Sequence, residues 1–217
     1  MDGTIANLKS ICDLADQYQA LVVIDDCHAT GFLGKSGRGT HEYCDVMGRI
    51  DIITGTLGKA LGGASGGYIA SSKPIIDWLR QRARPYLFSN TLAPMITATS
   101  LEVFNILEHE GDALREKLFE NTLIFRKSME ESNFQIKPGN HPIVPIMLFD
   151  EKHAQLMSQK LIDDGIYVVG FSYPVVPKGQ ARIRVQLCAT HSKKQIQTTI
   201  EKFQKIQKSY LRKHYEL

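Results

Sequence analysis

Cysteine is scarce in this 217-residue sequence, and no two of its four cysteines are close enough to form a Cys-x-x-Cys pair. Zinc sites and disulfide frameworks are recognised by closely spaced cysteines, so neither is expected here. Cys12, Cys27, Cys44 and Cys188 instead predict reduced thiols in a cytosol-like compartment.

Long hydrophobic runs and a strong charge excess are also missing. No apolar run approaches the length that crosses a bilayer, so we expect no membrane partner. The net charge of +3 is too small to indicate nucleic acid as a partner. The amino terminus lacks a basic stretch followed by an apolar one, so no signal peptide is expected. We therefore expect a cytoplasmic protein, or one of the mitochondrial matrix if the source is eukaryotic.

The first part of the chain has the pattern of an α/β domain with a parallel sheet. Ala20–Ile24 and Ile50–Thr54 are almost continuously apolar, which is typical of strands buried on both faces. Gly67–Ala70 is a third predicted strand. Helices are predicted near residues 5–15 and from Pro74, since proline suits a first helical turn. Three strands are few for such a sheet, and no strand precedes the first helix, so this domain is expected to be incomplete at its N-terminus.

From Pro94 the pattern changes to alternating helices and strands with turn signals between them. A smaller α/β domain over residues 94–217 is therefore predicted after a large domain over 1–93. Its predicted elements are helices at 94–109, 112–131 and 152–163, strands at 143–148, 166–169 and 182–187, and a terminal helix. That helix has one apolar stripe, expected to be buried, with its lysines on the solvated face: Ile196, Ile200, Phe203, Ile206 and Tyr210.

Two polar residues lie at the carboxyl end of the first predicted strand. Asp25 ends it and His28 comes three residues later. Ligands of open α/β sheets bind outside the carboxyl ends of the strands, which is where both residues are expected. Taken singly, Asp25 could equally cap a helix and His28 could be a structural histidine.

The glycine-rich segment Gly55–Gly67 contains a single lysine, Lys59. A nucleotide P-loop would require glycine in place of Ile53 and serine or threonine in place of Ala60, so that motif fails twice. We expect Lys59 to be buried among the glycines, where a charged, unpaired amine is costly. A Schiff base with a carbonyl cofactor explains such a lysine better than a solvated surface loop does.

Asp25 and Lys59 are expected at the ends of successive strands. Pyridoxal phosphate requires a lysine for its aldehyde and a carboxylate for its pyridinium nitrogen, so this pair predicts that cofactor. The hydroxyl of Thr56, three residues before the lysine, could bind the phosphate.

Three segments carry a resemblance to a known family: Asp25–Gly34, Thr56–Gly63 and Arg80–Asn90. They resemble the α-oxoamine synthases, which are dimeric pyridoxal-phosphate enzymes of the aspartate-aminotransferase fold (fold type I). The resemblance implies an acyltransferase that condenses an amino acid with an acyl-CoA. Gly55–Tyr68 and Tyr173–Arg184 point to the member that uses glycine and acetyl-CoA in threonine breakdown.

The resemblance also implies a role for each matching residue. Lys59 would be the Schiff-base lysine, Asp25 the partner of the pyridine nitrogen, and His28 the partner of the phenolic oxygen. Thr56 would bind the phosphate, as would Ser89 and Asn90 from the neighbouring subunit of a homodimer. Arg184 would bind the amino-acid carboxylate. Without the resemblance, Arg182 and Arg184 are equally placed, because alternate residues of a strand face the same way.

Members of the family begin well before the position that matches Met1. Met1 is therefore expected to be an internal methionine of a longer ancestor, or the start of a gene fragment. Two alternatives to the glycine-specific enzyme stay open. One is an inactive fragment or a subunit completed by a partner, and the other is a different α-oxoamine synthase, such as one that makes 8-amino-7-oxononanoate.

Overall fold

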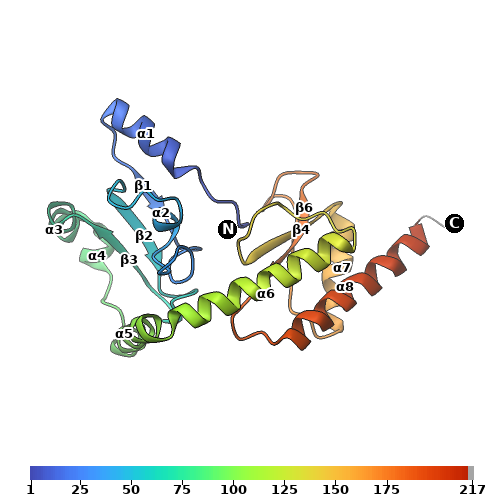
Figure 1. The fold of residues 1–217 in the computed structure, drawn as a ribbon. Coiled ribbons are helices and arrows are strands. Elements are labelled where there is room, and N and C mark those ends of the chain that lie inside the picture. The colour runs from blue at the N-terminus through green and yellow to red at the C-terminus, as the bar shows by residue number, and fades with distance from the viewer. Residues whose placement is uncertain (215–217) are drawn as a thin grey trace. The chain divides into compact units, whose positions relative to one another are not determined.

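The computed structural model describes residues 1–214, with side chains described as far as residue 209 (Figure 1). It contains two compact units. We call Ile5–Arg115 the N-terminal unit, and Met1–Thr4 together with the chain from Glu116 the C-terminal unit. The fold class predicted from the sequence, α/β with strands and helices alternating, is confirmed by this element order. The two compact units divide after Arg115. The domain boundary between residues 93 and 94 stays a prediction.

The N-terminal unit is built on a three-stranded sheet in the order β1-β2-β3. Its strands are β1 (Val23–Asp25), β2 (Ile52–Thr56) and β3 (Gly67–Ser71). β1 and β2 are parallel, but β3 runs antiparallel to β2. The prediction of an all-parallel sheet is therefore wrong for the third strand. The reason lies in the connection: the 57–66 loop is too short for a crossover and suits only an antiparallel neighbour.

Helices of the N-terminal unit differ in how much they bury. α1 (Leu8–Tyr18) places Leu8, Cys12 and Ala15 in a small core with Val22 and Val46. By contrast, α3 (Lys73–Arg82) and α4 (Arg84–Phe88) have no buried residue. The remaining helices are α2 (Thr40–Tyr43) and α5 (Pro94–His109). The short helices α2 and α4 have no counterpart in the sequence prediction, because four or five residues give no periodicity to detect.

The C-terminal unit contains an antiparallel sheet in the order β4-β6-β5. Its strands are β4 (Ile143–Phe149), β5 (Val169–Phe171) and β6 (Ala181–Gln186), and α7 (Glu151–Asp163) packs against all of them. The long helices are α6 (Gly111–Glu131) and α8 (Lys193–His214). The strand predicted at 166–169 lies later, at β5, because the hydrophobic residues before it serve the turn that leaves α7.

The core of the C-terminal unit is closed. Phe203 is fully buried and meets Phe125 and Phe134 edge to face, with ring centroids 6.5 and 5.8 Å apart. The predicted stripe of α8 is confirmed at Ile196, Ile200, Phe203 and Ile206, which are all buried, while the Tyr210 side chain lies outside the described residues. These contacts join α8 to α6 and to the segment that follows α6.

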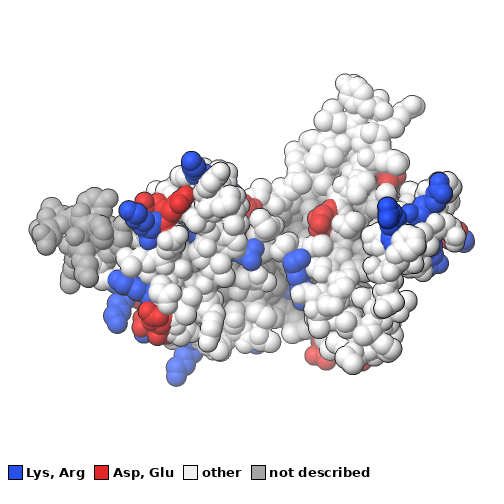
Figure 2. Space-filling model, turned by 180° about the vertical axis from the view of Figure 1, so that it is seen from behind, with Lys and Arg blue, Asp and Glu red and all other residues white. Residues whose placement is uncertain are grey.

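On the face drawn in Figure 2, acidic and basic side chains are interspersed in small groups. Within residues 1–214, no helix is long and apolar enough to span a bilayer. The four cysteines are free thiols, as the sequence predicted.

Candidate functional site

The parallel pair β1 and β2 brings the predicted cofactor residues to one edge of the sheet. Asp25, the last residue of β1, is in register with Thr54, and the next amide, of Asp26, donates to the Thr54 carbonyl at 2.9 Å. β2 ends two residues later at Thr56, and Lys59 follows in the loop. Asp25, Thr56 and Lys59 therefore leave the sheet at the same carboxyl edge, as the sequence predicted.

Asp25 is held as an ionised acceptor. Hydrogen bonds from Cys27, with its backbone N–H 3.0 Å from Oδ1, lower the pKa of the Asp25 carboxyl. Burial raises that pKa, by less than the hydrogen bonds lower it, and the charges of Lys59 and His28 make still smaller contributions that lower it. Lys59 also acts on the neighbouring Cys27. Burial, followed by the interactions with Asp25, raises the pKa of the Cys27 thiol, and the charge of Lys59 lowers it. Lys59 and His28 therefore each lie within electrostatic reach of Asp25.

The loop that holds Lys59 is folded by its own backbone. The Leu57 N–H donates to the Gly66 carbonyl at 2.9 Å and the Gly63 N–H to the Leu57 carbonyl at 2.6 Å. Gly63 is required by close approach, since a Cβ there would lie 2.5 Å from Ser100 Oγ and 3.0 Å from the Leu57 oxygen. The Lys59 side chain is exposed. The prediction that Lys59 is buried is therefore wrong, because glycines supply close backbone packing but no side chains to cover an amine.

Thr56 closes the same loop. Its hydroxyl donates to the Gly66 carbonyl at 3.1 Å and accepts from the Gly58 N–H at 3.2 Å. A ligand phosphate would accept the hydroxyl proton in place of Gly66. Thr56 as a phosphate ligand stays a prediction.

His28 lies in a turn that depends on Asp26, a residue that the sequence analysis did not single out. Asp26 is buried and accepts from the Thr30 hydroxyl at 3.0 Å and from both the N–H and the hydroxyl of Thr40, at 3.1 and 2.5 Å. The chain from β1 to α2 is thus folded around one buried carboxylate. The Asp25-Asp26 pair was the available signal: the second carboxylate folds the turn, and the first remains at the sheet edge.

The two arginines of β6 have different surroundings although they face the same way. Arg182 is buried and donates to the Gln180 carbonyl at 2.9 Å and to Asp2 Oδ2 at 3.3 Å. Arg184 is half-buried, its guanidinium lies 4.8 Å above the Phe171 ring, and Nη1 donates to the Met1 carbonyl at 3.2 Å. Arg182 is therefore committed to an internal ion pair, whereas no acidic side chain among the described residues pairs with Arg184.

Ser89 and Asn90 follow α4 on the N-terminal unit, and both are exposed. Arg84, at the start of that helix, stacks on Phe88 at 6.0 Å. This exposure leaves Ser89 and Asn90 accessible for the predicted contact with a neighbouring subunit.

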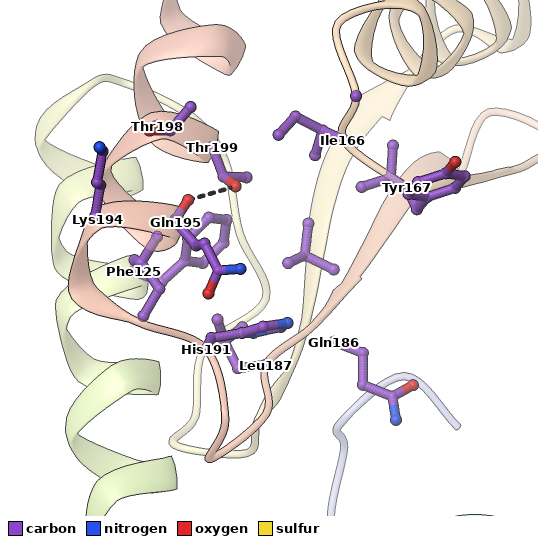
Figure 3. Close-up of a pocket in the computed structure, with 14 residues that line it drawn as sticks. Phe125, Ile166, Tyr167, Gln186, Leu187, His191, Lys194, Gln195, Thr198 and Thr199 are labelled. Atoms are coloured by element: carbon purple, nitrogen blue, oxygen red, sulfur yellow. Dashed lines mark hydrogen bonds between the residues drawn. The ribbon is translucent and has the colours of Figure 1, made fainter.

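A hollow of about 430 Å³ in the C-terminal unit contains none of the predicted site residues (Figure 3). Two of its polar side chains already have partners: His191 Nδ1 accepts from the Cys188 N–H at 3.1 Å, and Thr199 donates to the Gln195 carbonyl at 2.9 Å. Within the described part of the chain, no three His, Cys, Asp or Glu residues are grouped to hold a metal ion.

Comparison with protein families explains this arrangement. The model of the family "Aminotransferase class I and II" matches residues 1–203. The chain belongs to this family. Among solved members, a serine palmitoyltransferase variant from S. paucimobilis with bound PLP–myriocin superposes with a TM-score of 0.90 at 33% identity, over 96% of this chain and 52% of that one. The superposition confirms the pyridoxal-phosphate type I fold expected from the resemblance.

Curated relatives in the family are more similar in sequence. The 2-amino-3-ketobutyrate coenzyme A ligase of Escherichia coli K12 is 58% identical over 96% of this chain and 52% of its own length. The human mitochondrial protein of the same name is 50% identical over 94% of this chain and 48% of its own. An 8-amino-7-oxononanoate synthase of Petrotoga mobilis is 46% identical over 96% and 53%. The chain thus spans about half the length of the curated relatives it matches.

Proposed function

We propose that this chain forms the lysine-bearing half of a pyridoxal-phosphate enzyme that condenses glycine with acetyl-CoA, giving 2-amino-3-ketobutyrate and CoA. The observation that carries the proposal is the convergence of Asp25 and Lys59 at one sheet edge, within electrostatic reach of each other. The 58% identity to a 2-amino-3-ketobutyrate coenzyme A ligase supports this choice of substrates. Threonine breakdown is the pathway that such a reaction would serve.

The residues at the edge fit pyridoxal phosphate chemically. Lys59 offers an accessible primary amine that would hold the aldehyde as a Schiff base. Asp25 has a lowered carboxyl pKa, so it would hold the pyridine nitrogen protonated by accepting its hydrogen bond. His28 would bind the phenolic oxygen and Thr56 the phosphate. When bound, the cofactor supplies a ring that accepts the electron pair left by proton removal from glycine.

The chain's own residues would then bind glycine and move its proton. Arg184 would bind the glycine carboxylate, since its planar fork matches a carboxylate and Arg182 is already committed to Asp2. The Nζ of Lys59 would accept the proton from the glycine α-carbon. His28 would orient the cofactor from the Asp25 side. The α-carbon then forms a bond with the thioester carbonyl carbon, and the carbon–sulfur bond to CoA breaks.

A homodimer would complete this site, with Ser89 and Asn90 contacting the phosphate bound by the neighbouring subunit. Their exposure on the N-terminal unit is compatible with that role. The expected compartment is the cytoplasm, or the mitochondrial matrix in a eukaryote, because the human relative is named as mitochondrial.

The test is the visible absorption band that pyridoxal phosphate gives when joined to a lysine. The purified protein incubated with pyridoxal phosphate should show the band, and Lys59→Ala should abolish it. Lys35→Ala is the matched control, since Lys35 is also exposed and belongs to the same unit. A band of full intensity in Lys59→Ala would refute the assignment.

Two alternatives remain distinguishable. If the protein is another α-oxoamine synthase, as the 46% identity to an 8-amino-7-oxononanoate synthase allows, substrate assays with glycine, alanine and serine will show faster turnover with alanine or serine. If it is an inactive piece or a subunit completed by a separate chain, cofactor binding will require co-purification with that chain.

A further inference from the structure

The N-terminal unit encloses a second hollow, of about 610 Å³, that contains none of Asp25, His28, Thr56 or Lys59. Its volume is within the range of about 300–1,000 Å³ that small-molecule sites occupy. One wall is apolar and comes from the sheet, the lysine loop and α5. The side chains that form it are Ile53, Leu61, Tyr68, Ala70, Phe104 and Leu107.

The hollow is also lined by two buried polar side chains with an unused nitrogen each. Arg115 is 8% exposed and His41 is 9% exposed. Arg115 Nη1 and His41 Nδ1 are both buried and have no hydrogen-bond partner among the described residues. Burying a polar atom without a partner costs free energy, and the cost is greater for a charged group. Both atoms belong to side chains that line the hollow, so a ligand there could satisfy them.

The second nitrogen of the Arg115 guanidinium is already used. Nη2 donates to the carboxylate of Asp112, whose side chain is 95% exposed. The other charged residues that line the hollow, Arg38 and Glu108, are exposed and opposite in sign. The buried Nη1 of Arg115 is therefore the unused charged donor in an otherwise largely apolar lining.

Two glycines keep the space beside Arg115 Nη1 open. A Cβ on Gly111 would lie 2.7 Å from Nη1, and one on Gly37 would lie 2.9 Å from it. Gly37 also has φ +74°, which disfavours any side chain. A larger residue at either position would fill the approach to the unused donor.

We infer that this hollow binds a small carboxylic acid with an apolar chain, as its carboxylate. The carboxylate would accept from Arg115 Nη1 and from His41 Nδ1 when that nitrogen is protonated, which supplies both missing partners. The apolar chain would lie against Leu61 and Phe104. The inference is independent of the proposed function, because it uses none of the cofactor residues.

Titration of the purified protein with hexanoate, followed by calorimetry, tests the inference. Hexanoate should bind with a millimolar or tighter Kd, while hexan-1-ol, which lacks the charge, and inorganic phosphate, which lacks the chain, should bind at least tenfold more weakly. Arg115→Gln should weaken hexanoate binding at least tenfold. Arg80→Gln is the matched control, since Arg80 is exposed and lies outside the hollow, and it should bind as the wild type does.

Ala70→Leu provides an independent variant if Arg115→Gln does not fold. It fills the apolar wall without touching the guanidinium and should abolish binding while circular dichroism stays unchanged. Three results would each overturn the inference: no heat of hexanoate binding to the wild type, equal affinity for hexanoate and hexan-1-ol, or unchanged affinity in the folded variants.

Discussion

The two units differ in how completely each buries its apolar residues. In the C-terminal unit, Phe125, Phe203 and Ile183 are fully buried. In the N-terminal unit, Val23 on the edge strand β1 is 58% exposed, Trp78 is 65% exposed and Phe88 is 79% exposed. The C-terminal unit also exposes some large apolar side chains, such as Tyr167 at 93%, but the unit that holds Asp25 and Lys59 exposes more of them.

The larger core and the proposed cofactor residues therefore lie in different units. The C-terminal unit has a core of its own, and it presents Arg184 from the middle strand of its sheet. The N-terminal unit fixes the cofactor residues by backbone register and by the buried Asp26, with little help from a large core.

The largest expected effect tests the closed core. Phe203→Ala should lower the free energy of unfolding by about 3–5 kcal/mol, because it removes a fully buried ring and leaves a cavity beside Phe125 and Phe134. Urea denaturation measures the change. Phe88→Ala is the matched control in the other unit, and its effect should be within about 0.5 kcal/mol. If both variants lost the same free energy of unfolding, the two units would not differ in how completely they bury these rings.

The next effect separates the two arginines of β6. Arg182→Gln should destabilise the C-terminal unit by about 1–3 kcal/mol, because it removes the buried donor to Gln180 and to Asp2. Arg184→Gln should cost less than about 1 kcal/mol, since that guanidinium is half-buried and stacks on a single ring. Urea denaturation of both variants gives the difference. In an active enzyme, Arg184→Gln should raise the KM for glycine, and an unchanged KM would reject its proposed role.

Asp2 predicts an acid sensitivity of the C-terminal unit. Burial alone would raise the pKa of Asp2, but hydrogen bonds from Lys137 and Thr4 outweigh it and hold that pKa well below its ordinary value. A carboxyl with a depressed folded pKa contributes stability above its unfolded pKa of about 3.9 and loses it as the pH falls towards the folded value. Unfolding free energy should therefore decline below about pH 4. Asp2→Asn should flatten this decline, and an identical slope in the variant would contradict the assignment.

Sequence alone placed the elements that have clear periodicity or continuous hydrophobicity. The helices at 94–109 and 152–163 and the strand at 52–56 are found within a few residues of prediction. The direction of β3 was missed because apolar content does not record strand direction, whereas the length of the 57–66 loop does. The exposure of Lys59 was missed because a glycine-rich segment shows where backbone packs closely, and not what covers the side chain.

Arg182 and Arg184 show a second limit. Their alternation predicts a shared face but not which of them is already paired, because the partner, Asp2, lies at the opposite end of the chain. Asp26 was overlooked for a similar reason: its partner Thr40 lies across the turn, fourteen residues further along the sequence. Local sequence patterns therefore do not predict contacts between residues that are far apart in the sequence.

The smallest expected effect is the most direct test of the proposed site. The charge of Lys59 helps to lower the pKa of Asp25, although hydrogen bonds from Cys27 do more. Lys59→Ala should therefore raise the Asp25 carboxyl pKa slightly, and Lys35→Ala should leave it unchanged. The side-chain carboxyl carbon resonance of Asp25, followed by NMR through an acid titration, measures both. The hydrogen bonds from Cys27 remain in either variant. A pKa shift that occurs only in Lys59→Ala therefore measures the electrostatic interaction between Lys59 and Asp25. An Asp25 pKa equal in wild type and Lys59→Ala would place the amine outside that reach, and the proposed cofactor site would then lack its central pair.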